Sequence, residues 1–390
     1  MKDTEPRGGT PTSARDGEAF GERDEGRLRE SWRRFRQNPL AVVGLATFLA
    51  FFLVAFAGLA LTSGAHPTLD PALIRLPEKL RPPLSRPNLP VLAAEQIPAL
   101  GIYLLGTDEY GRDVFARMMQ GAWVSMTVGF VAVGIAVGVG IILGGLAGYY
   151  GRAKVRFGHL VAASGLAGAA VVAVAGTPTL AVGLACLGAG FTLLSLRRRR
   201  RSSRGTLRWA FFPCLSVDTA LMRLVDLMLC FPSFFLILTV VALLPPSLFN
   251  IMAVIGLTSW MGTARFIRAE FLALREQDFV VAVQALGVPD WRIVLRHLIP
   301  NAVAPVLVSA TIGIATAILT EAGLSFLGFG VPPPHATWGN ILSGGKNYLF
   351  DAPWLTLIPG VAILIVVLAF NLFGEGLRDV LNPRLRERIS

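Results

Sequence analysis

The chain has 390 residues, of which 53% are hydrophobic and only 16% are charged. Its mean hydropathy of +0.59 is too high for an ordinary soluble protein, and repeated charge-free runs of bilayer-spanning length predict an all-α polytopic membrane protein. The net charge of +11 is informative mainly through its position, because basic residues gather beside the cytoplasmic ends of membrane spans; a nucleic-acid footprint is the alternative interpretation.

Residues 1–26 mix Gly, Pro, Thr and both charges without apolar periodicity, which predicts a disordered cytoplasmic tail. Residues 27–62 carry an arginine-rich entry followed by an apolar run from Leu40 to Leu61. This run is longer than the core of a signal peptide, so we expect a retained first transmembrane helix. The arginines place its entry, and with it the N terminus, on the cytoplasmic side.

Residues 63–117 are expected to form an extracytoplasmic loop, because this Pro-rich segment lacks clear periodicity over most of its length. Near its end stand Asp108, Arg112 and Asp113, just before the next apolar run. We interpret these three as a structural ion-pair set at the entrance of a span. Direct contact with a substrate is the alternative.

Residues 118–151 predict the second transmembrane helix. Small residues at near-helical spacing let helices approach closely in lipid, so we expect a tightly packed or sliding helix. The glycines concerned are Gly129, Gly134, Gly138, Gly140, Gly144, Gly145 and Gly148.

Residues 152–216 contain an apolar stretch, 160–196, interrupted at Gly176-Thr177-Pro178 and followed by the basic segment RRRRRSSR. A stretch of this length can form two short spans, since one span needs about 17–25 residues. An even number also keeps the later loops on their expected sides. We therefore predict an inserted two-helix hairpin, for which simple Gly/Ala-rich packing is the alternative to a function.

Residues 217–384 hold four further predicted spans. The third, from Leu224 to Leu244, contains Pro232, which is either a hinge or a kink tolerated by neighbouring helices. The fourth runs from about Leu248 to Phe266, the fifth ends near Thr320, and the last begins after Ala352-Pro353-Trp354. Residues 385–390 would be a cytoplasmic tail.

The segment between the fourth and fifth spans predicts two short helices. Asp278 is suited to cap one that starts at Phe279, and Asp290 a second that starts at Trp291 and runs on into the fifth span. Gly287 suits the left-handed residue that ends the first helix, and Pro289 prevents its continuation.

The first short helix has about two turns, too few to be stable alone in water. Phe279, Val283 and Leu286 recur at i, i+4 and i+7 on one face, so we expect this face to pack against a partner. An unpartnered surface helix is the alternative. The residues predicted to dock are Phe279, Ala282, Val283, Leu286, Gly287 and Asp290.

This loop resembles the cytoplasmic loop shared by the permease subunits of ABC importers, in which Glu-Ala-Ala precedes a Gly and a later Ile-x-Leu-Pro. Here Val281-Ala282-Val283 stands in place of Glu-Ala-Ala, Gly287 matches, His297 replaces Ile, and Ile299-Pro300 replaces Leu-Pro. We refer to residues 269–298 as the coupling loop, because the corresponding loop of the family docks on the ATPase subunit.

Other motifs are similar to the dipeptide and oligopeptide branch of this family. Glu321-x-x-Leu324-Ser325-Phe326-Leu327-Gly328 is a close match, and the segment 152–216 departs from the family pattern. Glu321 and Ser325 are candidates for the translocation path or an outer gate, with a carboxylate at the outer membrane interface as the alternative. Further matches are Leu105–Asp108, Gly111–Val114, Asp218, Met222, Arg223, Asp226, Trp260, Ala264, Arg265, Trp338, Gly339 and 369–384.

The resemblance implies a six-helix permease of the bacterial cytoplasmic membrane with both termini inside the cell. It also implies a second related permease, two ATP-hydrolysing subunits, an extracytoplasmic substrate-binding protein and a peptide substrate, with no nucleic acid. The sequence shows no Walker loop, no metal-binding spacing among Cys186, Cys214 and Cys230, and no nucleophile with its base. We therefore expect no enzyme activity, cofactor or metal in this chain.

Three alternatives to peptide import follow from the same sequence. An importer of nickel chelates or glycosides would share the architecture, because the binding protein largely sets selectivity. An ion-coupled secondary transporter would be favoured by clustered intramembrane acids or inverted repeats, and neither is evident. A membrane-embedded enzyme is disfavoured because the polar groups do not assemble.

Overall fold

The computed structural model describes residues 32–33, 35–64, 67–151, 154–156 and 213–381. The chain divides into two compact units, which we describe separately. Unit 1 comprises Met1–Val133, Leu238–Gly256 and Ala304–Ser390, and unit 2 comprises Gly134–Ile237 and Leu257–Val303.

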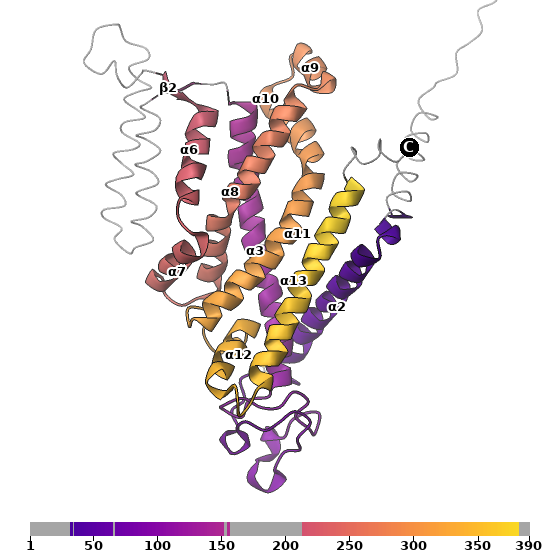
Figure 1. The fold of residues 1–390 in the computed structure, drawn as a ribbon, viewed down its shortest axis with the longest axis vertical. Helices are drawn as coiled ribbons and strands as arrows, with labels where there is room; N and C mark the ends of the chain where they lie inside the picture. The colour runs from indigo at the N-terminus through magenta and orange to yellow at the C-terminus, as the bar shows by residue number, and fades with distance from the viewer. Residues whose placement is uncertain (1–31, 34, 65–66, 152–153, 157–212, 382–390) are drawn as a thin grey trace, which may run out of the picture. The chain divides into compact units, whose positions relative to one another are not determined.

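The described residues are almost entirely helical, which confirms the all-α prediction (Figure 1). The helices are α2 (Pro39–Thr62), α3 (Val114–Tyr149), α6 (Val217–Leu229), α7 (Ser233–Leu243), α8 (Leu248–Arg275), α9 (Asp278–Ala285), α10 (Asp290–Ile293), α11 (Ile299–Phe326), α12 (Trp338–Gly345) and α13 (Trp354–Leu381). Shorter turns are η1 (Leu76–Glu78), η2 (Leu89–Val91), η3 (Ala94–Gln96), the π-helical η5 (Val294–Leu298) and η6 (Lys346–Tyr348). The strands β1 (Lys154–Arg156) and β2 (Pro213–Ser216) pair antiparallel.

Four helices of the described chain are long and apolar enough to cross a membrane: α2, α3, α13, and the continuous helix Asp290–Phe326 formed by α10, η5 and α11. The predicted third span is α6 and α7, which meet the same test together but are bent by 81°. The bend lies at Pro232, so this span is broken rather than merely kinked. The predicted fourth span, α8, is less apolar, because its last turns carry Arg265, Arg268 and Glu270.

In unit 1, α2 packs along α13, and Figure 1 shows these two helices side by side. The N terminus of α2 is capped by Asn38, whose Oδ1 accepts the backbone N–H of Leu40 at 3.1 Å. Phe48 of α2 lies between two rings of α13, 5.0 Å from Phe370 and 4.8 Å from Phe373, centroid to centroid. Offset and edge-on rings of this kind add stability beyond burial alone, which fixes the register of the pair.

The outer segment of unit 1, residues 67–113, consists of short turns joined by irregular chain, as its composition predicts. Trp354, the first residue of α13, fastens it to the helices by donating its indole N–H to the carbonyl of Thr107 at 3.3 Å. Trp338, the first residue of α12, donates to the carbonyl of Met118 in α3 at 3.0 Å. Gly111 has φ +71°, and any side chain there would overlap the carbonyl of Arg75.

In unit 2, the second half of α3 packs closely on α8 through glycines. A Cβ on Gly144 would overlap the carbonyl of Ala264, and a Cβ on Gly148 would lie 2.6 Å from the Cβ of Phe271. The prediction of tight glycine packing is therefore confirmed at these positions. At Gly134 and Gly138 a Cβ would meet no atom of the described residues within 4 Å, so these two glycines take no part in the contact with α8.

Ion pairs attach α6 to α8 within unit 2. Arg268 donates through Nη2 to Oδ2 of Asp218 at 2.6 Å, and Arg265 through Nη2 to Oδ1 of Asp226 at 2.6 Å. The predicted tails, 1–26 and 385–390, and nearly all of the predicted hairpin within 152–216 lie outside the described residues.

Candidate functional site

The coupling loop in unit 2 consists of α9, a turn at Gly287, and α10 (Figure 1). Gly287 has φ +74°, which confirms the predicted left-handed residue. The predicted caps are wrong by one position. Asp278 and Asp290 are the first helical residues, and Gln277 and Pro289 take the cap positions without a side-chain bond. Carboxylates in a first turn still interact favourably with the helix dipole.

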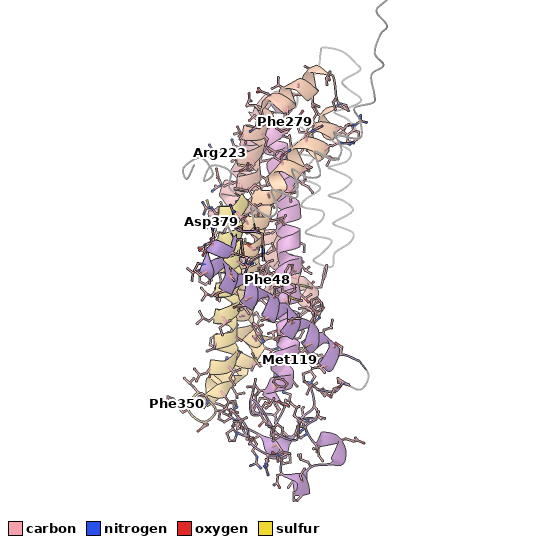
Figure 2. The ribbon with its side chains drawn as sticks, turned by 90° about the vertical axis from the view of Figure 1, so that its right-hand side faces the viewer. Phe48, Met119, Arg223, Phe279, Phe350 and Asp379 are labelled. Atoms are coloured by element: carbon pink, nitrogen blue, oxygen red, sulfur yellow. The ribbon has the colours of Figure 1, made fainter. Side chains whose placement is uncertain are left out.

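Two residues of the predicted apolar face, Phe279 and Leu286, are exposed, and Val281 is exposed as well. Val280 is fully buried and anchors the helix, while Val283 is half-buried. The exposed apolar side chains are Phe279 at 37%, Val281 at 52% and Leu286 at 82% of their surface. We call these three residues the α9 cap; Figure 2 labels Phe279 among them. The predicted site residue Ala282 is exposed between them.

A polar contact set joins the coupling loop to the end of α3. The hydroxyl of Tyr149 donates to Oδ1 of Asp290 at 2.8 Å and receives a longer contact from Nε2 of Gln284 at 3.5 Å. Arg275, at the end of α8, donates through Nη1 to the carbonyl of Tyr149 at 3.3 Å. The sequence analysis identified Asp290 but missed its partners, because the pairing joins residues 141 positions apart.

α10 continues without interruption through η5 into α11. Ile293 and Leu298 are fully buried, so the start of this long helix is held by packing as well as by Asp290. The segment from Trp291 to Leu298 is helical throughout, with one π-helical turn within it.

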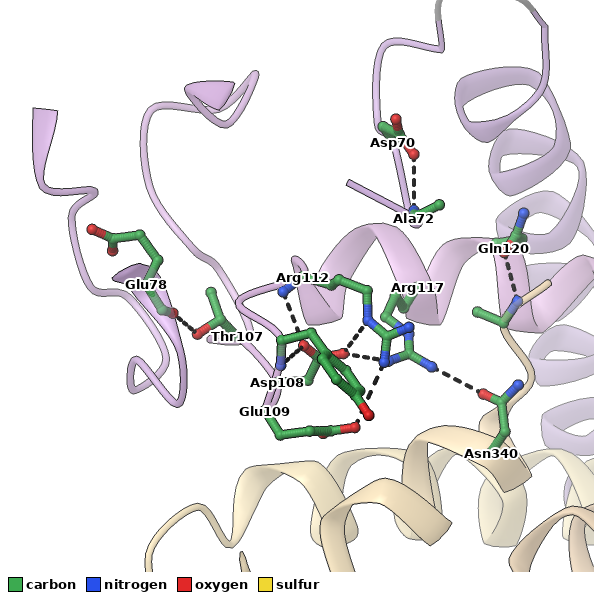
Figure 3. A network of polar contacts seen from close by, with 12 residues as sticks. Asp70, Ala72, Glu78, Thr107, Asp108, Glu109, Arg112, Arg117, Gln120 and Asn340 are labelled. Carbon is green, nitrogen blue, oxygen red and sulfur yellow. Dashed lines mark hydrogen bonds and ion pairs between the residues drawn. The ribbon is translucent and has the colours of Figure 1, made fainter. Parts of the chain in front are cut away.

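A second polar cluster lies in unit 1, where the outer segment meets α3 (Figure 3). Asp108 is 1% exposed. Its carboxylate accepts a hydrogen bond from Nε of Arg112 at 2.7 Å and also forms an ion pair with Arg117. Arg117 reaches Oδ1 of Asn340 in α12 at 3.2 Å. The ion pair predicted for Asp108 and Arg112 is confirmed, and Arg117 is the member that the sequence analysis missed.

Asp113 does not join this ion-pair set, contrary to the prediction. It caps α3, accepting the backbone N–H of Phe115 through Oδ1 at 2.9 Å. Burial raises the pKa of Asp113, although the backbone donors and Arg75 act in the opposite direction. No ion pair of Asp113 is found among the described residues, so burying this acid is unfavourable, and the helix terminus offsets part of the cost.

The other predicted site residues lie together near the end of α11 in unit 1. Glu321 is 0% exposed, and its Oε1 accepts the hydroxyl of Ser325 at 2.6 Å. Thr337, which caps α12, lies 3.4 Å from Ser325 between hydroxyl oxygens. A Cβ on Gly339 would lie 2.7 Å from Ser325. The carboxylate is therefore enclosed by its own unit and tied to the start of α12, rather than lying on a surface.

These long apolar helices, with a short two-helix loop between two of them, are typical of a multi-pass membrane protein. Residues 206–387 match the family described as "Binding-protein-dependent transport system inner membrane component". Residues 26–83 match the "N-terminal TM domain of oligopeptide transport permease C".

Similar proteins extend the match to nearly the whole chain. The chain is 33% identical over 358 residues to the dipeptide transport system permease protein DppC of Alkalihalophilus pseudofirmus, covering 92% of this chain and 90% of that relative. It is 30% identical to the oligopeptide transport system permease protein OppC of Bacillus subtilis, with 96% and 95% covered. It is 31% identical to DppC of Haemophilus influenzae, covering 92% of this chain and 96% of that relative. The chain belongs to the dipeptide and oligopeptide branch of the ABC importer permeases, multi-pass proteins of the inner membrane.

Proposed function

We propose that this chain is the permease subunit through which short peptides are imported, and that it takes mechanical work from separate ATPase subunits through its coupling loop. The ATPases bind the α9 cap, and a second related permease completes the translocation path. An extracytoplasmic binding protein delivers the peptide. The names of the relatives support a peptide substrate, while nickel chelates or glycosides remain the alternative cargo of the same architecture.

The observation that carries this proposal is the apolar α9 cap. Phe279 and Val281 are exposed on an eight-residue helix whose only fully buried side chain is Val280, and Leu286 is exposed at the residue that follows the helix. A helix this short gains most of its stability from packing, so a partner that covers the cap would both bind and order it. The exposed docking residues are thus Phe279, Val281 and Leu286, with Val281 in place of the predicted Val283.

The connection behind the cap supports transmission of force. Tyr149, Gln284 and Asp290 hold the two short helices to the end of α3, and α10 runs on into α11. A push on the cap therefore acts on two membrane spans at once. The docking site would lie in the cytoplasm, together with both termini.

The energies involved are compatible with this role. Driving a two-state gate from 1:99 to 99:1 requires about 5.5 kcal/mol of differential interaction. Fully burying a Phe, Val or Leu contributes about 1.5–3 kcal/mol. Three such residues could hold the loop in a cleft while the ATPases close.

We assign Glu321 and Ser325 to an outer gate within the same proposal. Their contacts tie the end of α11 to α12 through Thr337, so a movement of α11 driven from the coupling loop would act on α12. The enclosed position of Glu321 favours a structural latch over direct contact with the peptide.

The test is to make the cap polar. We expect Leu286→Asp and Phe279→Asp to abolish co-purification of the ATPases and ATP-dependent peptide uptake, while membrane insertion stays normal. Phe350→Asp is the matched control, because Phe350 is 97% exposed but lies between η6 and α13 rather than in the coupling loop. Normal ATPase co-purification in both cap variants would refute the proposal.

A further inference from the structure

The outer segment of unit 1 lines a half-open cavity of about 520 Å³. This volume is within the range of about 300–1,000 Å³ typical of small-molecule sites. Its apolar wall includes Leu69, Leu73 and Ile97, and its charged lining residues are Arg75, Asp70, Glu95 and Asp113. The cavity lies outside the coupling loop and is not used by the mechanism proposed above.

Arg75 is the unusual member of this lining. Arg75 is 4% exposed, and its Nε donates a hydrogen bond to the carbonyl of Gln96 at 2.5 Å. Its guanidinium carbon lies 5.9 Å from the centroid of the Tyr103 ring. Its Nη1, however, is buried with no hydrogen-bond partner among the described residues. A buried guanidinium N–H without an acceptor is costly, and a ligand carboxylate is the partner whose geometry suits it best.

The acidic residues that line the cavity differ in how many of their carboxylate oxygens already accept hydrogen bonds. Asp113 is already engaged as the cap of α3, and Asp70 accepts the backbone N–H of Ala72 at 2.8 Å through one oxygen. Glu95 is exposed. Asp70 and Glu95 therefore keep carboxylate oxygens available for a cationic group that enters from outside.

The mixture of positive and negative charges around the cavity restricts the chemical class of the ligand. Three carboxylates disfavour a polyanion such as phosphate, and a guanidinium disfavours a simple metal cation. No group of three or more acidic, His or Cys side chains among the described residues is arranged to hold a metal. A molecule with both an ammonium and a carboxylate group satisfies Arg75 and the acids together.

We propose that this cavity is a binding site for a short peptide with free amino and carboxyl termini. The carboxylate pairs with Arg75, and the ammonium group lies toward Asp70 and Glu95. The apolar wall accepts small side chains. The identity of the ligand as a peptide rests on the proposed function; the site would receive peptide on the outer side of the membrane.

The experiment uses the complete transporter in lipid nanodiscs without its binding protein, and radiolabelled dialanine as the probe. Ala99 lines the cavity and is exposed, so Ala99→Trp fills the space without removing any contact of Arg75. We expect it to weaken dialanine binding by at least about tenfold, the loss typical of one charge-assisted hydrogen bond. Ala93→Trp is the matched control, because Ala93 is exposed in the same segment but does not line the cavity.

Chemical variants of the probe test the role of each charge. Dialanine amide, which lacks the carboxylate, should compete at least about tenfold less well than dialanine. Glu95→Gln should weaken dialanine binding but leave competition by N-acetyl-dialanine unchanged, since that compound has no ammonium group.

Equal binding by wild type and Ala99→Trp, equal competition by the amide, or no dialanine binding to the wild type would each overturn the proposal. A weaker association of the binding protein with unchanged dialanine binding would also overturn it, in favour of a protein docking surface. ATP-dependent peptide uptake by the wild-type complex with its binding protein tests the proposed function separately. That uptake would persist if only the cavity proposal were wrong.

Discussion

Asp113 serves two purposes at the N terminus of α3, where it caps the helix and lines the outer cavity. Burial raises its pKa. A group whose native pKa lies above its unfolded value stabilises the fold fully below the unfolded pKa, and this contribution is lost as the pH rises through the native value. Asp113 therefore makes the native state less stable at neutral pH than in weak acid.

The substitution that tests this is Asp113→Asn. The Asn side chain keeps an oxygen that can cap α3, but it cannot ionise. We expect its thermal stability to vary less than that of the wild type as the pH rises from about 4, near the ordinary pKa of an aspartate, toward neutrality. Unfolding of the purified complex followed over this pH range measures the difference. Identical pH dependence of the two proteins would contradict the account of Asp113.

Asp290 shows why the chemistry of single residues was only partly predictable. An Asp after Pro289 is typical of a helix cap, yet its carboxylate bonds Tyr149 instead of a backbone N–H. The local pattern contains no information about a hydroxyl from a distant helix. Gly287 was predictable, because its positive φ is a local requirement that Gly meets at low cost.

At the scale of elements, the close approach of α3 and α8 depends on particular glycines. Gly144 faces the carbonyl of Ala264, whereas a Cβ on Gly138 would meet nothing within 4 Å. We expect Gly144→Ala to destabilise the protein by about 1–3 kcal/mol, because the added methyl forces the helices apart. Gly138→Ala should instead be neutral or stabilising by up to about 1 kcal/mol, because Ala favours the helix.

The same chemical change is expected to lower the stability of the protein at Gly144 but not at Gly138, so each variant is the control of the other. The midpoint of thermal unfolding of the purified transporter is the measurement. If both variants lowered it equally, the packing stripe would not be where the structure puts it.

Element positions were largely predictable because long apolar runs must form helices in lipid, where every backbone polar group needs an internal partner. Breaks were not. Pro305 and Pro359 lie inside continuous helices, whereas Pro232 separates α6 from α7 with a bend of 81°. The three residues share the same lost N–H, so this loss alone does not decide where a helix breaks.

The burial of the individual residues of α9 was only partly predictable. Helical spacing places Phe279, Val283 and Leu286 on one face, and that arithmetic is sound for an isolated helix. In the structure Val280 is the buried anchor, and Gln284 turns toward Tyr149. The contacts of α9 with the rest of unit 2 therefore set which face is exposed.

For the whole molecule, hydropathy and arginine position predicted a multi-pass membrane protein, and motif spacing predicted its family. Both predictions use features that lie close together in the sequence. The links that fix the fold join distant residues, such as Arg117 and Asn340, which are 223 positions apart. One sequence gives no signal for such pairs. The Asp108–Arg112 ion pair was predictable because its partners are four positions apart, whereas the link to Asn340 and the cavity appear only in the structure.

Coupling is a property of the whole transporter, and Tyr149 offers a way to separate it from docking. Tyr149→Phe removes the hydroxyl that bonds Asp290 and Gln284 but leaves the α9 cap unchanged. We expect the ATPases to remain bound and to hydrolyse ATP, while the amount of peptide imported per ATP falls, because the loop moves without moving α3. Parallel measurement of uptake and hydrolysis in proteoliposomes gives this ratio.

The matched control is Tyr150→Phe. Tyr150 adjoins Tyr149, with ring centroids 4.9 Å apart, and no hydrogen bond of its hydroxyl is found among the described residues. Its substitution should leave the ratio of uptake to hydrolysis unchanged. If Tyr149→Phe lost the ATPases altogether, the hydroxyl would belong to the docking surface. If it matched Tyr150→Phe, the bond to Asp290 would carry no force, and transmission would have to run through α10 and α11 alone.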